Sequence, residues 1–332
     1  MSVAAAGQAR ENLGSPPPAV LKNKVAQALS LLLVQSYSLP PPYTLLATLL
    51  SLTRDSAGAL RPASTDLVLR IMHDLSLTLG SDTMLRAVRS RERLARDGAV
   101  RDEIRAHNAS AIAQMLWATV RESLGNVGSG RWPDNTAEEI TEQAVRVVGD
   151  YVCESAYQAC TSPHLTHLAA WTDISLMVTP ETVQILYTLL QHSSPALRNV
   201  AAECLYEVTT KGMLAPDKIE LLRALDLTTV VDSLEQSTRG KTESGEPDNE
   251  FRERLAKLAN ANSMELARII EDTAVDAAVR AQADDLLMRS LPLALTFLGD
   301  EYDDMAEVIQ PCLSQALTIV RRRVACLLRR HR

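Results

Sequence analysis

The chain has 332 residues and a formal net charge of −7, and only 4% of its residues are aromatic. Leu and Ala dominate and Gly and Pro are few, a composition that argues against a β-protein. The mild negative charge excludes a nucleic-acid binder held by global charge, but it allows local basic patches. This length predicts either several domains or one extended array, in which each repeat packs only on its neighbours.

The beginning of the sequence and its cysteines predict a soluble intracellular protein. Residues 1–19 are polar and rich in proline, which is typical of a disordered leader and not of a signal peptide. No uninterrupted apolar run reaches membrane-spanning length. The cysteines are odd in number and not closely paired, which favours reduced thiols in the cytosol or nucleus. They are Cys153, Cys160, Cys204, Cys312 and Cys326.

Helical patterns separated by turns begin at Val20. Proline cannot continue a helical hydrogen-bond ladder, so "LPPP" at 39–42 separates a first helix from a second helix over 43–52. Two helices with a proline-marked turn fall within about forty residues, close to the period of HEAT-type repeats. The residues expected on one apolar face of the first helix are Leu21, Val25, Leu29, Leu32 and Leu33.

The same pattern recurs further along the chain. Apolar stripes predict helices over 65–79, 98–124, 136–152, 179–192 and 194–211. The last two open with Thr179-Pro180 and Ser194-Pro195, a capping residue followed by a proline at the first helical position. Further helices follow a polar loop at 236–250. The sequence therefore predicts an all-α HEAT-repeat α-solenoid, a superhelical array of antiparallel helix pairs.

Motifs for catalysis are absent from this pattern. The sequence has no Gly-rich phosphate loop, nucleophile elbow or HExxH pair, so we expect no enzyme and no cofactor. One short stretch contains four residues of the types that bind zinc: Cys153, Cys160, His164 and His167. The cysteine spacing is wider than in zinc fingers, and the histidines are too close for an i, i+4 pair. We expect a surface loop there and no metal site.

Several segments resemble the tRNA exportins (the exportin-T family of the importin-β or karyopherin superfamily), in a fungal-like form. The most similar is "LRNVAAECLYEVTTKGM" at 197–213. Each motif is weak alone, but their order agrees with the family over most of residues 21–320. The other segments are "LKNKVAQALSLLLVQSY" (21–37), "RERLARDGAVRDEIRAHNASAIAQMLWATV" (91–120), "AVRVVGDYV" (144–152) with "WTDISLMV" (171–178), "DNEFRERLAKLAN" (248–260) and "LTFLGDEYDDMAEVIQPCLSQAL" (295–317).

The chain departs from the family pattern at residues 153–170. This stretch interrupts an element that is continuous in the family, so we interpret it as an insertion or a retained intron. The chain as a whole resembles an internal fragment of the first half of an exportin-T. The expected domains are a leader (1–19), exportin-type HEAT repeats (20–152), an insertion loop (153–170) and further HEAT repeats (171–332) with the polar loop at 236–250.

The resemblance implies a nuclear export receptor that binds tRNA cooperatively with Ran-GTP and shuttles between nucleus and cytoplasm. Its implied partners are tRNA, Ran-GTP and nuclear pore proteins, with no membrane and no small-molecule substrate. A curved helical array suits this task because it can follow the shape and phosphates of a folded RNA. The alternative is a HEAT-repeat scaffold for proteins, or a karyopherin with protein cargo, and composition does not separate the two.

On this resemblance, phosphates of tRNA are expected to contact Arg91, Arg93, Arg96, Arg101, Arg105 and Lys211. Arg101 and Arg105 are four residues apart on one helix and point together, while the earlier arginines are expected in the loop before it. The alternative is a solvated helix face whose arginines are balanced by Glu92, Asp97, Asp102 and Glu103.

Lys211 and its neighbour Gly212 also fit a simpler interpretation. Glycine is typical just past a helix end, and a lysine there complements the negative end of the helix dipole. On the family resemblance, the same end lies at the rim of the array, where a lysine can reach phosphate. The residues expected to bind Ran are Lys22, Asn23, Lys24, Asp303 and Asp304.

Overall fold

The computed structural model of the chain describes residues 19–37, 43–79, 88–133, 135–153, 177–211, 213–225, 227–235 and 248–298, together with Gln310, Ser314 and Thr318. Within these ranges the chain is mostly helical, and the β-structure is limited to one isolated bridge between Arg54 and Leu60. The prediction of an all-α helical-repeat solenoid is confirmed. No helix in these ranges is both long and apolar enough to cross a membrane.

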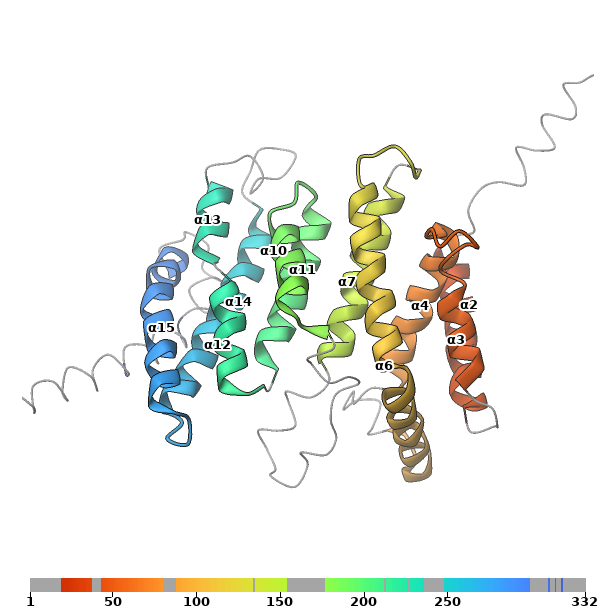
Figure 1. Cartoon of the computed structure of the whole chain (residues 1–332), viewed down its shortest axis with the longest axis horizontal. Coiled ribbons are helices and arrows are strands. Elements are labelled where there is room, and N and C mark those ends of the chain that lie inside the picture. Colours follow the sequence, from red (N-terminus) through yellow and green to blue (C-terminus); the bar gives the residue numbers. More distant parts are fainter. Residues whose placement is uncertain are drawn as a thin grey trace, which may run out of the picture. The chain divides into compact units, whose positions relative to one another are not determined.

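The helices follow one another along the chain (Figure 1). They are α2 (Ala19–Ser36), α3 (Tyr43–Ser51), α4 (Pro62–Leu79), α6 (Arg91–Asn126), α7 (Thr136–Cys153), α10 (Pro180–Leu190), α11 (Pro195–Thr210), α12 (Ala215–Ala224), α13 (Leu227–Glu235), α14 (Asn249–Glu271) and α15 (Ala277–Leu298). The chain divides into two compact units, Met1–Arg101 and Asp102–Arg332, and the division falls inside α6. The predicted leader, the insertion after Cys153 and most of the polar loop lie outside the described residues.

In the first unit, α2 packs against α4 through polar contacts. Lys22 Nζ lies 2.8 Å from Asp66 Oδ2, and Arg70 Nε lies 2.8 Å from Asp66 Oδ1. Arg70 Nη1 also donates to Asn23 Oδ1 at 2.5 Å. These bonds fix which side of α2 faces α4.

The predicted apolar face of α2 is therefore wrong in part. The side that carries Lys22 continues through Ala26, Ser30 and Leu33, and these three residues are buried. Leu21, Val25 and Leu32, which we expected in the core, are 53%, 41% and 52% exposed. The polar bonds to α4 and the small residues Ala26 and Ser30 turn a different stripe inward than leucine spacing alone indicates.

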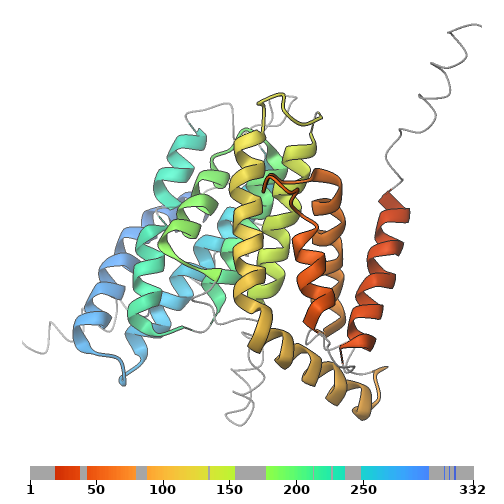
Figure 2. The same ribbon diagram turned by 45° about the vertical axis from the view of Figure 1, so that its right-hand side comes forward.

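The second unit is a succession of packed helices (Figure 2). α11 packs against both α7 and α14, and α14 packs in turn against α15. α6 and α7 are joined by a bond from Thr141 Oγ1 to Ser123 Oγ at 2.8 Å. A Cβ placed on Gly149 of α7 would lie 3.7 Å from Cys204 Cα of α11, so these two helices approach closely at that point.

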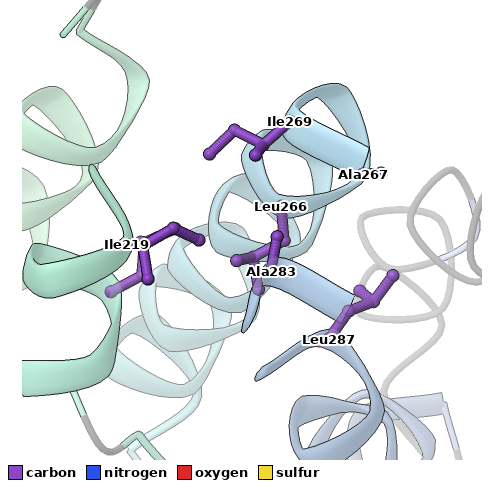
Figure 3. Close-up of a cluster of buried hydrophobic side chains, with 7 residues drawn as sticks. Ile219, Leu266, Ala267, Ile269, Ala283 and Leu287 are labelled. Atoms are coloured by element: carbon purple, nitrogen blue, oxygen red, sulfur yellow. The ribbon is translucent and has the colours of Figure 1, made fainter. Parts of the chain in front are cut away.

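The far end of the second unit has its own apolar cluster (Figure 3). Ile219 of α12 meets Leu266 of α14, and Ala283 and Leu287 of α15 complete the contact. Each helix contributes one apolar stripe and none could bury it alone, which is the packing logic of repeat proteins.

Two predicted helix starts are confirmed atom by atom. Thr179 Oγ1 accepts a hydrogen bond from Thr182 N at 3.3 Å, and Ser194 Oγ accepts one from Leu197 N at 3.4 Å. Each cap is followed by a proline at the helix start. Ser194 Oγ also donates to Glu138 Oε1 in the first turn of α7, so this cap links two neighbouring helices.

The start of α6 differs from the prediction. We expected the helix to begin at Gly98, with the preceding arginines in a loop, but α6 begins at Arg91. The Ser90 hydroxyl accepts a hydrogen bond from Arg93 N at 3.2 Å and so satisfies one of the free N–H groups of the first turn. With that start in place, Gly98 lies inside the helix and does not interrupt it.

Candidate functional site

Three predicted arginines lie on the surface of the first turns of α6. Arg91, Arg93 and Arg96 are all exposed. Arg93 and Arg96 are three residues apart and are therefore neighbours on the helix surface. Arg93 Nε lies 3.7 Å from Asp97 Oδ2, and the Arg93 side chain remains 47% exposed. This part of α6 presents a small basic surface.

Arg89, just before the helix, has a structural task instead. Its Nη1 donates to the Thr78 carbonyl at 2.5 Å and lies 3.2 Å from Asp97 Oδ2. Thr78 belongs to the last turn of α4, where carbonyl groups have no partner within their own helix. Arg89 thus closes the end of α4 and joins it to α6 through the buried carboxylate of Asp97.

The pair Arg101 and Arg105 does not form the expected surface site. Arg101 is 4% exposed, and Arg105 is half-buried. Arg101 lies one turn after the buried Asp97, on the side of α6 that also buries Val100 and Ile104. The helix register therefore directs Arg101 inward, and a phosphate contact does not fit this position.

Lys211 also lies inside the protein and not at a rim. It is the residue that ends α11, and its backbone N–H donates to the Glu207 carbonyl at 3.2 Å. Its side chain is 5% exposed in total, and Nζ donates to the Val152 carbonyl at 3.0 Å. Val152 is in the last turn of α7, so Lys211 complements the end of a neighbouring helix. The expected phosphate role does not fit this burial, and Gly212 lies outside the described residues.

Lys218 repeats this arrangement one helix later, and the sequence did not single it out. The residue is 0% exposed, and Nζ donates to the carbonyls of Thr209 and Lys211 at the end of α11. Glu265 Oε2 of α14 lies 3.8 Å from Nζ. Burial lowers the pKa of Lys218 to about 8, against the opposing attraction of Glu265, and nearby Arg268 lowers it further.

Arg198 holds together three helices of the second unit. The side chain is 1% exposed, and Nη1 donates to the carbonyls of His192 and Ser193 at 3.0 and 2.8 Å, just past the end of α10. Nη2 lies 2.9 Å from Asp248 Oδ2, and the guanidinium carbon lies 5.2 Å from the centre of the Phe251 ring. Asp248 Oδ1 in turn caps α14 by accepting from Phe251 N at 3.1 Å.

The residues expected to bind Ran fall into three groups. Lys22 and Asn23 are engaged with α4 by the bonds described above. Lys24 is exposed, and Nζ donates to Gln27 Oε1 at 3.4 Å on the same helix. Asp303 and Asp304 lie outside the described residues.

Of the four cysteines and histidines that were weighed as zinc ligands, only Cys153 lies in the described ranges. In the described ranges, no three His, Cys, Asp or Glu residues gather closely enough to hold a metal ion. Cys160, His164 and His167 lie outside these ranges. Cys204 of α11 is a free thiol in the core, and burial raises its pKa, with smaller contributions from Glu207 and Asp150.

A groove of about 340 Å³ lies between α11 and α14, and its net negative charge disfavours RNA binding. Arg254 crosses it, 2.9 Å from Glu203 Oε1 and 2.7 Å from Glu250 Oε1. Four carboxylates face two cations, which repels phosphate. The lining residues are Ala202, Glu203, Tyr206, Glu207, Glu250, Glu253, Arg254 and Lys257.

Residues 18–205, more than half of the chain, match the family described as exportin 1-like protein. The chain belongs to this family. Three curated relatives of this exportin-family chain, all named exportin-T, extend the similarity over nearly its whole length. The relative from Mycosarcoma maydis is 41% identical over 340 residues, which cover 93% of this chain and 29% of the relative.

The other two relatives are more distant but cover the same span. The Laccaria bicolor protein is 31% identical over 317 residues, which cover 91% of this chain and 28% of the relative. The Yarrowia lipolytica protein is 30% identical over 325 residues, which cover 95% and 28%. The resemblance to exportin-T is confirmed, and the chain spans less than a third of the length of these relatives.

Proposed function

We propose that the chain is part of a nuclear export receptor that binds tRNA together with Ran-GTP. In this proposal the receptor contacts nuclear pore proteins and shuttles between nucleus and cytoplasm. The observation that carries the proposal is 41% identity with a protein named exportin-T over 93% of the chain. The helical-repeat architecture supports it, because stacked helices offer a long surface to a folded RNA that is recognised by shape and phosphates.

The phosphate contacts that we propose are Arg91, Arg93 and Arg96. All three are exposed on α6, whereas Arg101 and Lys211 are enclosed by protein. Arginine suits this task because its planar guanidinium can bind phosphate through two parallel hydrogen bonds. Arg105, half-buried, is a secondary candidate. For Ran, the candidate that we keep is Lys24, which is exposed, because Lys22 and Asn23 are bonded to α4.

The decisive experiment is a filter-binding titration of this chain with tRNA, in the presence and absence of Ran-GTP. We expect Ran-GTP to tighten tRNA binding. Replacing Arg93 and Arg96 together by alanine should weaken it and flatten the plot of log affinity against log salt by about one unit per lost phosphate contact. Arg146→Ala is the matched control, because Arg146 is an exposed arginine of α7 that pairs with Glu142 at 2.6 Å.

Two results would contradict the proposal in different ways. If tRNA does not bind, with or without Ran-GTP, while a protein cargo does, the chain belongs to a protein-binding karyopherin or scaffold. If tRNA binds but the double variant and Arg146→Ala behave alike, the receptor function stands and the assignment to α6 is wrong.

A further inference from the structure

Ser90 is an exposed serine at the edge of the basic surface of α6. It lies just before the helix, and its neighbours in the chain are open to solvent, since Val88 is 82% exposed and Arg91 is exposed as well. Ser90 Oγ accepts a hydrogen bond from Arg93 N at 3.2 Å. A group attached to this oxygen therefore begins at the first turn of α6, among the arginines of the basic surface.

The stretch of chain around Ser90 is positively charged. Residues 88–97 contain four arginines and two carboxylates, Glu92 and Asp97, so this stretch carries a net charge of +2. Asp97 is buried and already lies 3.2 Å from Arg89 Nη1 and 3.7 Å from Arg93 Nε. A phosphate ester on serine carries a charge of about −1.5 to −2 at pH 7. One phosphate on Ser90 therefore cancels most of the positive charge of this surface.

The same stretch selects both the residue that is modified and the kind of enzyme that modifies it. Ser90 is the single hydroxyl side chain in residues 88–97. Protein kinases discriminate among substrates by the charges beside the acceptor hydroxyl, and here Arg89, Arg91 and Arg93 surround it. This pattern fits a kinase with an acidic substrate groove. Once attached, the phosphate can accept hydrogen bonds from Arg93 N and from guanidinium groups, and such charge-assisted bonds are strong.

We propose that Ser90 is a phosphorylation site and that its phosphate blocks the basic surface of α6. A serine kinase transfers the γ-phosphoryl group of ATP to Ser90 Oγ. The new O–P bond forms, the bond from this phosphorus to the bridging oxygen breaks and releases ADP, and the hydroxyl proton passes to the catalytic base of the kinase. The attached phosphate then takes the place on Arg93 and Arg96 of a tRNA phosphate. This consequence rests on the proposed function, whereas the modification and its contacts do not.

The first experiment tests the modification on the whole chain. The chain is incubated with protein kinase C, a serine kinase that favours basic substrates, and with ATP labelled in the γ-phosphoryl group. Mass spectrometry then identifies the labelled residue. We expect label on Ser90, and replacing Arg91 and Arg93 together by alanine should slow the labelling about tenfold. Ser110 is the matched control and should stay unlabelled, because it is exposed on the same helix but has no arginine within four residues. Labelling that misses Ser90, or that does not depend on the arginines, overturns the proposal.

The second experiment tests where the phosphate lies and needs no RNA. Phosphoserine is incorporated genetically at position 90, and phosphorus NMR follows its titration. Nearby cations favour the dianion, so we expect the pKa of this phosphate to lie below its ordinary value of about 6. The pKa should return towards that value when Arg93 and Arg96 are replaced by alanine, and also when the chain is unfolded in urea. An ordinary pKa in the folded, unaltered chain would show that the phosphate does not pair with the arginines.

The third experiment measures the consequence for tRNA. With Ran-GTP present, phosphoserine at position 90 should weaken tRNA binding about tenfold and flatten the plot of log affinity against log salt. Phosphoserine at position 110 adds the same charge to the same helix and should change neither. Circular dichroism checks that both modified chains are folded.

The outcomes separate this inference from the proposed function. If the unmodified chain binds tRNA and both phosphoserine chains bind it equally well, the blocking role of Ser90 is wrong and the proposed function stands. If the unmodified chain does not bind tRNA, the proposed function and the blocking role both fail, and the first two experiments still decide the modification and its contacts.

Discussion

Cationic side chains occupy two opposite environments in this chain, the solvent at the start of α6 and the protein interior at the end of α11. Arg91, Arg93 and Arg96 face water and have little to hold them in place. Lys211 and Lys218 are buried, with their ammonium groups on the carbonyls that end α7 and α11. Helix C-termini carry partial negative charge and unpaired carbonyls, so they can hold a buried cation that would otherwise be excluded from the core. A cation near a helix end in sequence is therefore a poor guide to a nucleic-acid surface.

The largest effect is expected from Arg198, the most connected of the buried cations. Arg198→Met removes the partner of Asp248 and leaves two carbonyls past the end of α10 without donors. We expect a loss of about 3–5 kcal/mol in the free energy of unfolding, because one charge of a buried pair stays uncompensated. Urea unfolding followed by circular dichroism measures it.

Arg254→Met is the matched control for that experiment. Arg254 also bridges two acidic residues, but its carboxylate partners Glu203 and Glu250 lie in an open groove. Screened pairs of this kind contribute about 1 kcal/mol or less. Equal losses for the two variants would show that burial is not what distinguishes these cations.

The pH dependence of stability should show the lowered pKa of Lys218. Its pKa is about 8 in the folded chain and 10.5 when unfolded, so the unfolded state binds more protons between these values. Stability from this group therefore rises as pH increases from about 8 to 10.5, by about 1.4 kcal/mol for each unit of pKa difference. The measurement is the difference in unfolding free energy between the unaltered chain and Lys218→Met at several pH values. A difference that stays flat or falls with pH contradicts the lowered pKa.

Lys211 should matter for stability and not for RNA. Lys211→Met leaves the Val152 carbonyl without its donor, which should cost about 1–3 kcal/mol in urea unfolding. The salt dependence of tRNA binding should stay the same as in the unaltered chain. If Lys211→Met lowers the salt dependence of tRNA binding and leaves stability unchanged, Lys211 contacts RNA and this prediction is wrong.

The smallest effect on stability is expected at the start of α6. Replacing Arg93 and Arg96 by alanine should change the free energy of unfolding by no more than about 0.5 kcal/mol, as is usual for exposed positions. Urea unfolding of the double variant and of the unaltered chain measures this change. A loss above 2 kcal/mol would mean that these arginines hold the fold, as Arg89 does, and that their exposure has been misjudged.

The sequence predicted helices well where local chemistry sets their ends. Thr179-Pro180 and Ser194-Pro195 carry the cap and the first helical residue in adjacent positions, so both starts could be read directly. The predicted start of α6 is wrong because glycine is typical of a helix boundary but Gly98 lies inside this helix, while Ser90 supplies the cap. The inward side of α2 was misjudged because its partners, Asp66 and Arg70, are more than forty residues away in sequence.

The candidate site could be predicted only in part, for the same reason. Exposure of Arg93 and Arg96 follows from a basic helix start, which is a local property. The partner of Lys211 is Val152, and nothing in the local sequence around Lys211 names it. Arg198 was missed because an arginine inside an apolar helix pattern shows its role only when the opposing helices are known.

In the helix-end contacts, the carbonyls are synthesised before the cations that bind them. Arg89, Arg198, Lys211 and Lys218 each follow in sequence the carbonyls that they bind. A ribosome adds about 5–20 residues per second, so roughly 3–12 seconds separate the synthesis of Val152 from that of Lys211, which is 59 residues later. During that interval the Val152 carbonyl lacks this donor, whereas Arg198 and Lys218 follow the carbonyls that they bind by only 5 to 9 residues. The carbonyls at these helix ends therefore receive their donors one after another, from the N-terminal side, as the chain emerges from the ribosome.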